Sequence, residues 1–253
     1  ATHILELTNV TGNVTITSSS GNSPTTPFDP SQVTEGTYTY TDVIGQPTVT
    51  AELDSNNNII ITSFEYTDTP ISMTDSDSVN TGIIALDGKE FTIHIKFNAD
   101  LTANNNKFIV SAMQYNETAN TYNGFSLSDY NNGFLRIATY NNRERSSTTG
   151  LLSPNASSSI PSTAVGAGTH EFDVTLTYNP IGYNSQYAQL TMVTYIDGVK
   201  QTNKFIRNTS STSTALPTSL TNATVTLGGN GIDNLDDINS MEILEFSVTK
   251  SNS

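Results

Sequence analysis

Apolar and polar residues alternate along residues 91–97, which read FTIHIKF. Because successive side chains leave opposite faces of a pleated strand, this period of two predicts a half-buried antiparallel strand. Its apolar face consists of Phe91, Ile93, Ile95 and Phe97. Its polar face consists of Thr92, His94 and Lys96. The preceding dipeptide, Asp87-Gly88, predicts a turn from another strand over 82–86.

The same pattern recurs along the rest of the chain. No stretch carries an apolar stripe of helical period over more than two turns. Asp197-Gly198 predicts a hairpin turn, because both residues tolerate a positive φ. This spacing of strands and turns is typical of a sandwich or barrel. Further strands are predicted over 108–113, 125–127, 134–140, 171–178, 190–196, 200–206, 224–227 and 243–250.

Residues 1–70 contain their own strand signals, over 37–43, 48–53 and 59–66. The segment from Pro70 to Asn80 is polar and acidic, which is typical of a boundary. We therefore predict a small N-terminal β module over residues 1–70, suited to attachment, and a larger domain over 75–253. The alternative is that the first strands join the larger sandwich.

Composition narrows the choice of partners. The net charge of −14 argues against nucleic acid and against an anionic membrane surface, since both attract Lys and Arg. Cysteine is absent, which excludes disulfides and thiolate chemistry. No apolar run approaches the roughly 20 residues that cross a bilayer, so no membrane insertion is expected. The start at Ala1 lacks a charged-then-apolar leader, so we expect a mature chain or one that never carried a signal.

Several of these motifs occur together in a familiar order: DGKEFTI over 87–93, HEFDVTLTY over 170–178, YIDG over 195–198, TLGG over 226–229 and ILEFSV over 243–248. This order resembles the concanavalin A-like (laminin G-like) jelly-roll family over about residues 75–250. The resemblance implies two antiparallel sheets packed face to face. With the small β module read from residues 1–70, the expected fold class is all-β, an antiparallel β-sandwich jelly roll preceded by that module. The resemblance also implies that rim loops or the concave face bind glycans or proteins, without catalysis.

No contiguous catalytic motif occurs in the sequence, although a Ser-His-Asp triad, whose members meet only in space, stays an open alternative. The paired-carboxylate pattern ExDxE of the family's glycoside hydrolases does not occur. Glu242 and Glu245 are three residues apart and would lie on opposite faces of a regular strand. No HExxH or GxSxG motif exists, and His170 is expected to hold the loop before its strand. The sequence therefore predicts a protein that is not an enzyme.

Calcium is the cofactor that the resemblance implies, because laminin G-like domains often hold one calcium ion at the loop rim. Two oxygen-rich clusters could serve as the metal site. The first consists of Asp233, Asp236 and Asp237, and the second of Asp75, Asp77 and Asn80. The alternative is that these are solvated loop carboxylates.

A sugar site needs an exposed aromatic ring and several hydrogen-bonding side chains. One candidate set follows the predicted strand over 134–140 and consists of Tyr140, Asn142, Arg143 and Arg145. A second candidate pairs Tyr183 with Tyr187. The alternative for each tyrosine is ordinary packing against its neighbours.

The function expected from these patterns is non-enzymatic binding by a surface-displayed module. The Asn-, Thr- and Ser-rich acidic composition resembles proteins of phages and low-GC bacteria, so a virion (fibre, tail or capsid-decoration) or extracellular cell-surface location is expected. Host-surface glycans or other virion proteins would be the partners, with a homo-oligomer or larger assembly providing multivalency. The alternatives are a purely structural virion or adhesin domain, and a divergent glycan hydrolase or lyase.

Overall fold

The computed structural model describes residues 3–10, 13–20, 23–24, 36–39, 45–53, 59–74, 79–80, 90–101, 106–130, 133–161, 163–183, 187–201, 205–208, 224–230, 232–233, 235–238 and 240–250. The predicted strand over 82–86 and the turn Asp87-Gly88 lie outside these residues, as do Asp75 and Asp77. The described part of the chain contains no helix long and apolar enough to cross a membrane.

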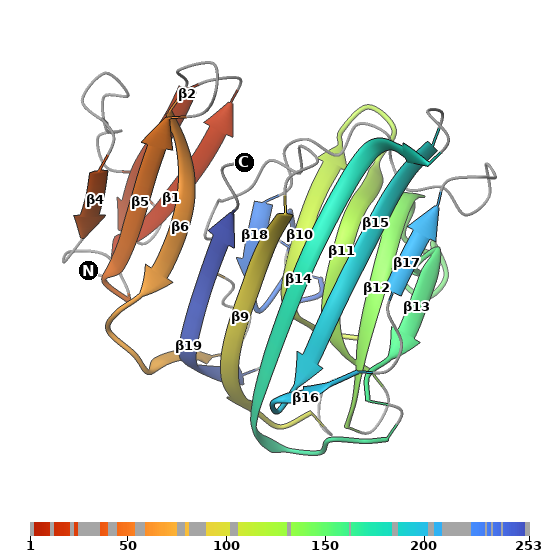
Figure 1. Cartoon of the computed structure of the whole chain (residues 1–253). Helices are drawn as coiled ribbons and strands as arrows, with labels where there is room; N and C mark the ends of the chain where they lie inside the picture. The colour runs from red at the N-terminus through yellow and green to blue at the C-terminus, as the bar shows by residue number, and fades with distance from the viewer. Residues whose placement is uncertain are drawn as a thin grey trace.

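Two antiparallel sheets form most of the molecule, and the chain passes repeatedly from one to the other (Figure 1). The six-stranded sheet has the order β13 (Ala156–Ser159), β12 (Phe134–Arg143), β11 (Thr121–Tyr130), β10 (Phe108–Asn116), β18 (Thr224–Leu227), β8 (Val79–Asn80). The path of the ten-stranded sheet is β16 (Val199–Lys200), β15 (Tyr187–Ile196), β14 (Gly168–Tyr183), β9 (Glu90–Ala99), β19 (Ser240–Lys250), β6 (Ile59–Tyr66), β5 (Pro47–Leu53), β4 (Gly36–Thr39). Beside this path, β17 (Phe205–Asn208) pairs with β15 and β7 (Ile71–Thr74) pairs with β19. The predicted fold class, an all-β antiparallel sandwich of the jelly-roll type, is confirmed.

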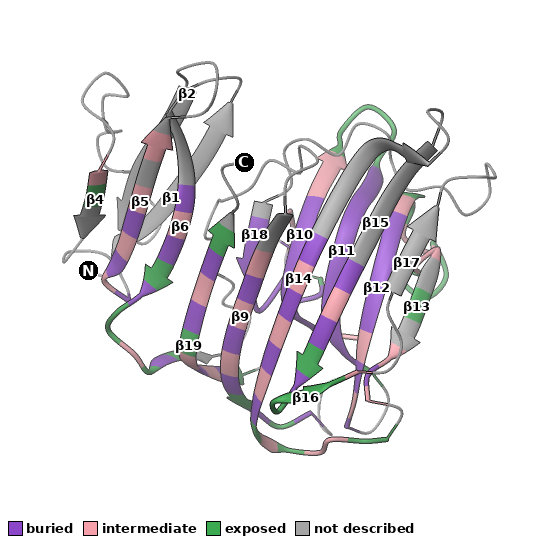
Figure 2. Ribbon diagram, in the orientation of Figure 1, coloured by how far each residue is buried: buried purple, intermediate pink, exposed green. Residues whose placement is uncertain are grey.

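Strand β9 lies inside the ten-stranded sheet, between β14 and β19. Its apolar residues Ile93, Ile95 and Phe97 are fully buried, whereas His94 is only half-buried. The alternation read from the sequence is therefore the alternation of the folded strand (Figure 2). The inward residues of β9, β14 and β19 form the main core together with apolar side chains of the six-stranded sheet.

The middle of the six-stranded sheet is buried on both of its faces. Along β11 every residue from Thr121 to Asp129 is buried, so the strand does not alternate (Figure 2). One face packs into the main core, and the other supports a second apolar cluster beneath the loops around residues 144–155 and 228–238. This second cluster consists of Phe108, Met113, Tyr122, Ala138, Tyr140 and Leu152.

The hairpin turn at Asp197-Gly198 is confirmed. Its two residues have φ values of 50° and 78°, the left-handed conformation that this turn requires. Between the predicted strands over 134–140 and 171–178 lies a strand that the sequence pattern did not predict, β13, which pairs with the edge of β12. Its sequence, ASSS, has no apolar alternation, so only the pairing with β12 defines it as a strand.

The N-terminal segment contributes strands to two sheets. Strands β1 (His3–Val10), β2 (Asn13–Ser20) and β3 (Ser23–Pro24) form a three-stranded sheet of their own. Strand β6, in contrast, pairs with β19, so the large sheet continues into residues 36–66. Pairing within a sheet does not show whether a segment folds alone, and the division of the chain at about residue 70 stays a prediction.

Candidate functional site

An ion-pair cluster lies on the loop-covered face of the six-stranded sheet, with Arg145 at its centre. Arg145 follows β12 and pairs with Leu152 across a short loop, which fixes its backbone. Its guanidinium lies 5.0 Å from the ring centroid of Tyr122 on β11. The carboxylates of Asp233 and Asp236 come from the loop after β18. Segments distant in the sequence therefore converge on one guanidinium.

The guanidinium of Arg145 uses both of its terminal nitrogens and Nε. Nη1 donates to Oδ1 of Asp236 and Nη2 to Oδ2, at 3.2 and 2.6 Å, which makes a bidentate pair. Nη2 also donates to Oδ1 of Asp233 at 3.1 Å. Nε donates to the hydroxyl of Tyr122, and Nη1 to the carbonyl of Gly150, both at 3.2 Å. These bonds account for the donors of Arg145, so its role here is to hold the loops.

Asn230 and Tyr122 complete the network. The amide nitrogen of Asn230 donates to both Asp233 and Asp236, at 2.9 and 2.6 Å. Tyr122 donates its hydroxyl to Asp233. Burial favours the neutral carboxyl of Asp233, but these hydrogen bonds and the charge of Arg145 outweigh burial and lower its pKa. Burial and the Asp233 hydrogen bond raise the pKa of Tyr122 to about 12. Asp233 is thus held as an anion beside a neutral phenol.

An open pocket of about 370 Å³ lies beside this network. Tyr115 and Tyr122 stand opposite each other on β10 and β11, with ring centroids 5.0 Å apart. The Tyr115 hydroxyl donates to Oδ1 of Asn120 at 2.6 Å, which ties the ring to the β10–β11 turn. The pocket is lined by Tyr115, Ala119, Asn120, Tyr122, Glu144 and Arg145.

The residues predicted to bind sugar do not form one group. Tyr140 is fully buried, with its ring 6.1 Å from that of Phe108, and so has no face open to a ligand. Its hydroxyl pairs with Ser126 at 3.1 Å inside the second apolar cluster. Burial raises the pKa of Tyr140. Tyr140 is therefore part of the packing beneath the loops.

The other predicted sugar residues lie apart from Tyr140. Asn142 is exposed and has a φ of 50°, and its backbone donates to Asn123. Arg143 donates from Nε to the carbonyl of Ser153 at 2.8 Å. Only Arg145 of this set lines the pocket. The second candidate set, Tyr183 and Tyr187, pairs directly in the β14–β15 ladder, but these side chains lie outside the described part of the structure.

Two of the three aspartates predicted to bind calcium, Asp233 and Asp236, lie close together in the structure. Asp233 and Asp236 are both paired with the guanidinium of Arg145, which occupies the position a cation would take between them. Asp237 is buried, and its backbone bridges to Phe108. The calcium expectation stays a prediction, and the structure adds that Arg145 would compete with the ion at this position.

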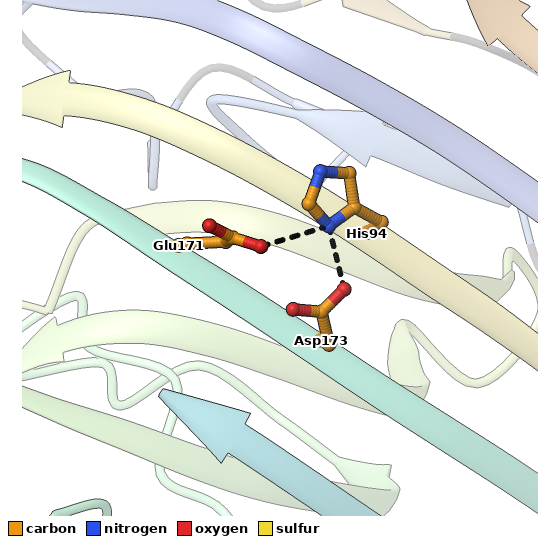
Figure 3. Close-up of side chains that lie close together, drawn as sticks. All are labelled: His94, Glu171 and Asp173. Carbon is orange, nitrogen blue, oxygen red and sulfur yellow. Dashed lines mark hydrogen bonds and ion pairs between the residues drawn. The ribbon is translucent and has the colours of Figure 1, made fainter. Parts of the chain in front are cut away.

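A second polar cluster lies on the outer face of the ten-stranded sheet, around His94 (Figure 3). Its ring nitrogens Nδ1 and Nε2 lie 2.5 Å from Oδ1 of Asp173 and 2.8 Å from Oε2 of Glu245. Oε1 of Glu171 is 3.8 Å from Nδ1. Burial acts against the charged imidazole, but the bonds to Glu245 and Asp173 outweigh it and raise the pKa of His94.

A β-bulge explains why the contact between His94 and Glu245 was not predicted from the sequence. The register of β19 against β9 shifts between Ile243 and Glu245. Glu242 and Glu245 therefore stand opposite Asn98 and Lys96, which share one face of β9. The prediction that Glu242 and Glu245 lie on opposite faces is wrong, because it assumed a regular strand.

The prediction that His170 holds the loop before its strand is confirmed, since Nε2 of His170 is 3.1 Å from the carbonyl oxygen of Gly166 in that loop.

Comparison with known proteins gives only distant likenesses. No family model and no curated protein matches the chain. Among solved structures, the alginate lyase Aly36B is similar with 10% identity and a TM-score of 0.44, over 85% of this chain and 86% of the lyase. Lectin II from Ulex europaeus is similar with 14% identity and a TM-score of 0.35, over 80% of this chain and 91% of the lectin. Basic winged bean lectin gives 11% identity and a TM-score of 0.32, over 85% and 90% of the two chains. These likenesses carry no conclusion about chemistry.

Proposed function

We propose that this protein is a non-enzymatic glycan-binding module and that the pocket between Tyr115 and Arg145 is its binding site. The observation that supports the proposal most is the pocket itself. It combines an aromatic wall with polar side chains, which is the combination that sugars require. The family resemblance of the sequence points to the same function.

The parts of the pocket have distinct roles in this proposal. The half-buried ring of Tyr115 presents an apolar surface to the face of a sugar ring. Exposed Asn120 and Glu144 offer an amide and a carboxylate to sugar hydroxyls. Arg145 contacts the ring of Tyr122 and donates to its hydroxyl, so the wall is held before a ligand arrives.

The composition of the pocket favours binding over glycoside hydrolysis. Hydrolysis of a glycosidic bond uses two carboxylates, about 5–10 Å apart, on either side of the bond. Glu144 is the one acidic residue that lines the described pocket. Asp233 and Asp236 lie nearby, but both are paired with Arg145. A virion or cell-surface location and assembly into a homo-oligomer are also part of the proposal. The alternative is a purely structural domain that binds no glycan, and a glycan-binding experiment separates the two.

Tyr115→Ala is expected to weaken glycan binding about tenfold, because loss of one stacking ring corresponds to roughly 1.4 kcal/mol. Binding would be measured on an array of bacterial surface glycans and then by calorimetry with the strongest ligand. Tyr115→Phe keeps the ring and loses only the hydrogen bond to Asn120, so it should retain most of the affinity.

Tyr195→Ala is the matched control, because this tyrosine is 38% exposed on the outer face of the other sheet. It should bind like the parent protein. An array on which no glycan binds above background would favour the alternative of a purely structural domain. Equal losses in Tyr115→Ala and Tyr195→Ala would place the site elsewhere.

A further inference from the structure

We propose that His94, Asp173 and Glu171 form a binding site for a divalent transition-metal ion, of which Zn²⁺ is the best candidate, on the outer face of the ten-stranded sheet. One ligand atom from each residue converges here, and these atoms all lie within 4.8 Å of one another. The proposed site is separate from the pocket assigned to glycans, since none of its residues lines that pocket.

The three side chains are brought together by strand register. Asp173 on β14 stands directly opposite His94 on β9, and Glu171 stands opposite Lys96, one diagonal step away on the same face. Both strands lie inside the sheet, so the ladder on either side fixes their backbones. Figure 3 shows the two carboxylates reaching the same ring nitrogen of His94.

The distances suit an ion after small movements of the side chains. In a tetrahedral site with Zn–N and Zn–O bonds near 2.0–2.2 Å, neighbouring ligand atoms are roughly 3.3 Å apart. The distances from Nδ1 of His94 to Asp173 and Glu171, 2.5 and 3.8 Å, lie on either side of that value. The side chains of Asp173 and Glu171 are 31% and 40% exposed, so they have room for shifts of under about 1 Å.

Glu245 gives His94 the orientation that a metal ligand needs. A histidine that binds a metal usually donates its other ring N–H to a carboxylate, which fixes the ring and the free nitrogen. Nε2 of His94 is bonded to Glu245 at 2.8 Å, and the other ring nitrogen, Nδ1, faces Asp173 and Glu171. A metal ion bound to Nδ1 would displace the proton that this nitrogen shares with Asp173. The bulge in β19 places Glu245 in this position.

The charge and donor types select the class of ion. Among the described residues, the ion pairs of Glu171, Asp173 and Glu245 are all with His94. Lys96 stands opposite both Glu171 and Glu245 on the same face, so three carboxylates lie near two cationic side chains. A divalent cation would neutralise this excess. An imidazole nitrogen with carboxylates suits zinc and similar transition metals, whereas Ca²⁺ takes oxygen ligands.

Calorimetric titration of the full, chelator-treated chain with ZnCl₂ tests the site. The parent protein should bind one Zn²⁺ saturably and bind Ca²⁺ at least about tenfold more weakly at this site, since calcium does not use the imidazole. His94→Asn and Asp173→Asn should abolish measurable binding. Glu245→Gln should weaken binding about tenfold, because it acts only by orienting the ring. Long-range ¹H–¹⁵N spectra should show Nδ1 of His94 as the metal-bound nitrogen.

Glu65→Gln is the control for general attraction by an acidic surface. Glu65 is exposed on the same face, opposite Ser247, which in turn stands opposite His94. This variant should bind Zn²⁺ within about twofold of the parent, because the substitution removes a similar negative charge from a residue that is not a ligand. The proposal is overturned if the parent shows no saturable binding, if His94→Asn binds normally, if Glu65→Gln loses as much as Asp173→Asn, or if Nε2 is the bound nitrogen.

Discussion

Arg145→Ala should lower the free energy of unfolding by about 3 kcal/mol, because removing one partner of a buried ion pair leaves the other charge uncompensated. The side chains of Arg145 and Asp236 are only 15% and 6% exposed. Burial opposes the charged guanidinium, but Asp236 outweighs burial and raises the pKa of Arg145, so the pair is ionised. Urea unfolding followed by tyrosine fluorescence would measure the loss.

Arg143→Ala is the matched control for this variant. Arg143 is two residues away and donates from Nε to one backbone carbonyl, that of Ser153. Its loss should cost less than about 1 kcal/mol. The double variant Arg145→Ala/Asp236→Asn should lose less free energy of unfolding than the two single variants lose together, because both substitutions remove the same ion pair. Equal small losses in Arg143→Ala and Arg145→Ala would contradict the role of Arg145 in holding the loops.

The contribution of Asp129 to the free energy of unfolding should fall as pH rises from about 4 to about 7. This residue is fully buried in β11, and its Oδ1 accepts one hydrogen bond from the backbone of Lys107 at 2.9 Å. Burial raises its pKa from 3.8 to about 7, against the opposing effects of that hydrogen bond and of the charges on Lys107 and Arg136. Between these pKa values the folded chain keeps a proton that the unfolded chain has lost. The contribution of Asp129 is therefore complete below pH 4 and is lost by pH 8.

Asp129→Asn isolates this contribution. An amide oxygen accepts the same hydrogen bond and does not titrate. Relative to the parent, the variant should gain roughly 2.5 kcal/mol of stability between pH 5 and pH 8, at about 1.36 kcal/mol per pKa unit. Unfolding curves of both proteins at the two pH values provide the test. Asp68→Asn removes the same charge from an exposed position and controls for net charge. A difference between Asp129→Asn and the parent that does not change with pH would contradict the prediction.

The fold was predictable where one face of a strand is buried. The alternation over 91–97 gave the inward residues of β9, and Asp197-Gly198 gave the hairpin turn. The pattern was less informative in the six-stranded sheet, because loops cover its second face and β11 does not alternate. The short strand β13 was missed for a related reason, since its position depends on the neighbouring edge of β12.

The sites were less predictable because they depend on contacts between segments distant in sequence. Arg145 and the aspartates at 233 and 236 were each selected separately, but their pairing with one another was not foreseen. Tyr115 and Tyr122 were not selected, although strands over 108–116 and 121–130 joined by a four-residue turn would have placed them opposite each other. The contact of His94 with Glu245 requires the bulge in β19, for which the sequence carries no signal.

Binding of an intact glycan at the Tyr115 pocket is the central claim, and native mass spectrometry tests it most directly. The protein would be mixed with the strongest array ligand and measured at once and after overnight incubation. The claim predicts a complex with the mass of one chain plus one whole glycan, unchanged with time and strongly reduced in Tyr115→Ala. Glycan fragments that accumulate with the parent protein, or a complex that Tyr115→Ala forms equally well, would contradict it.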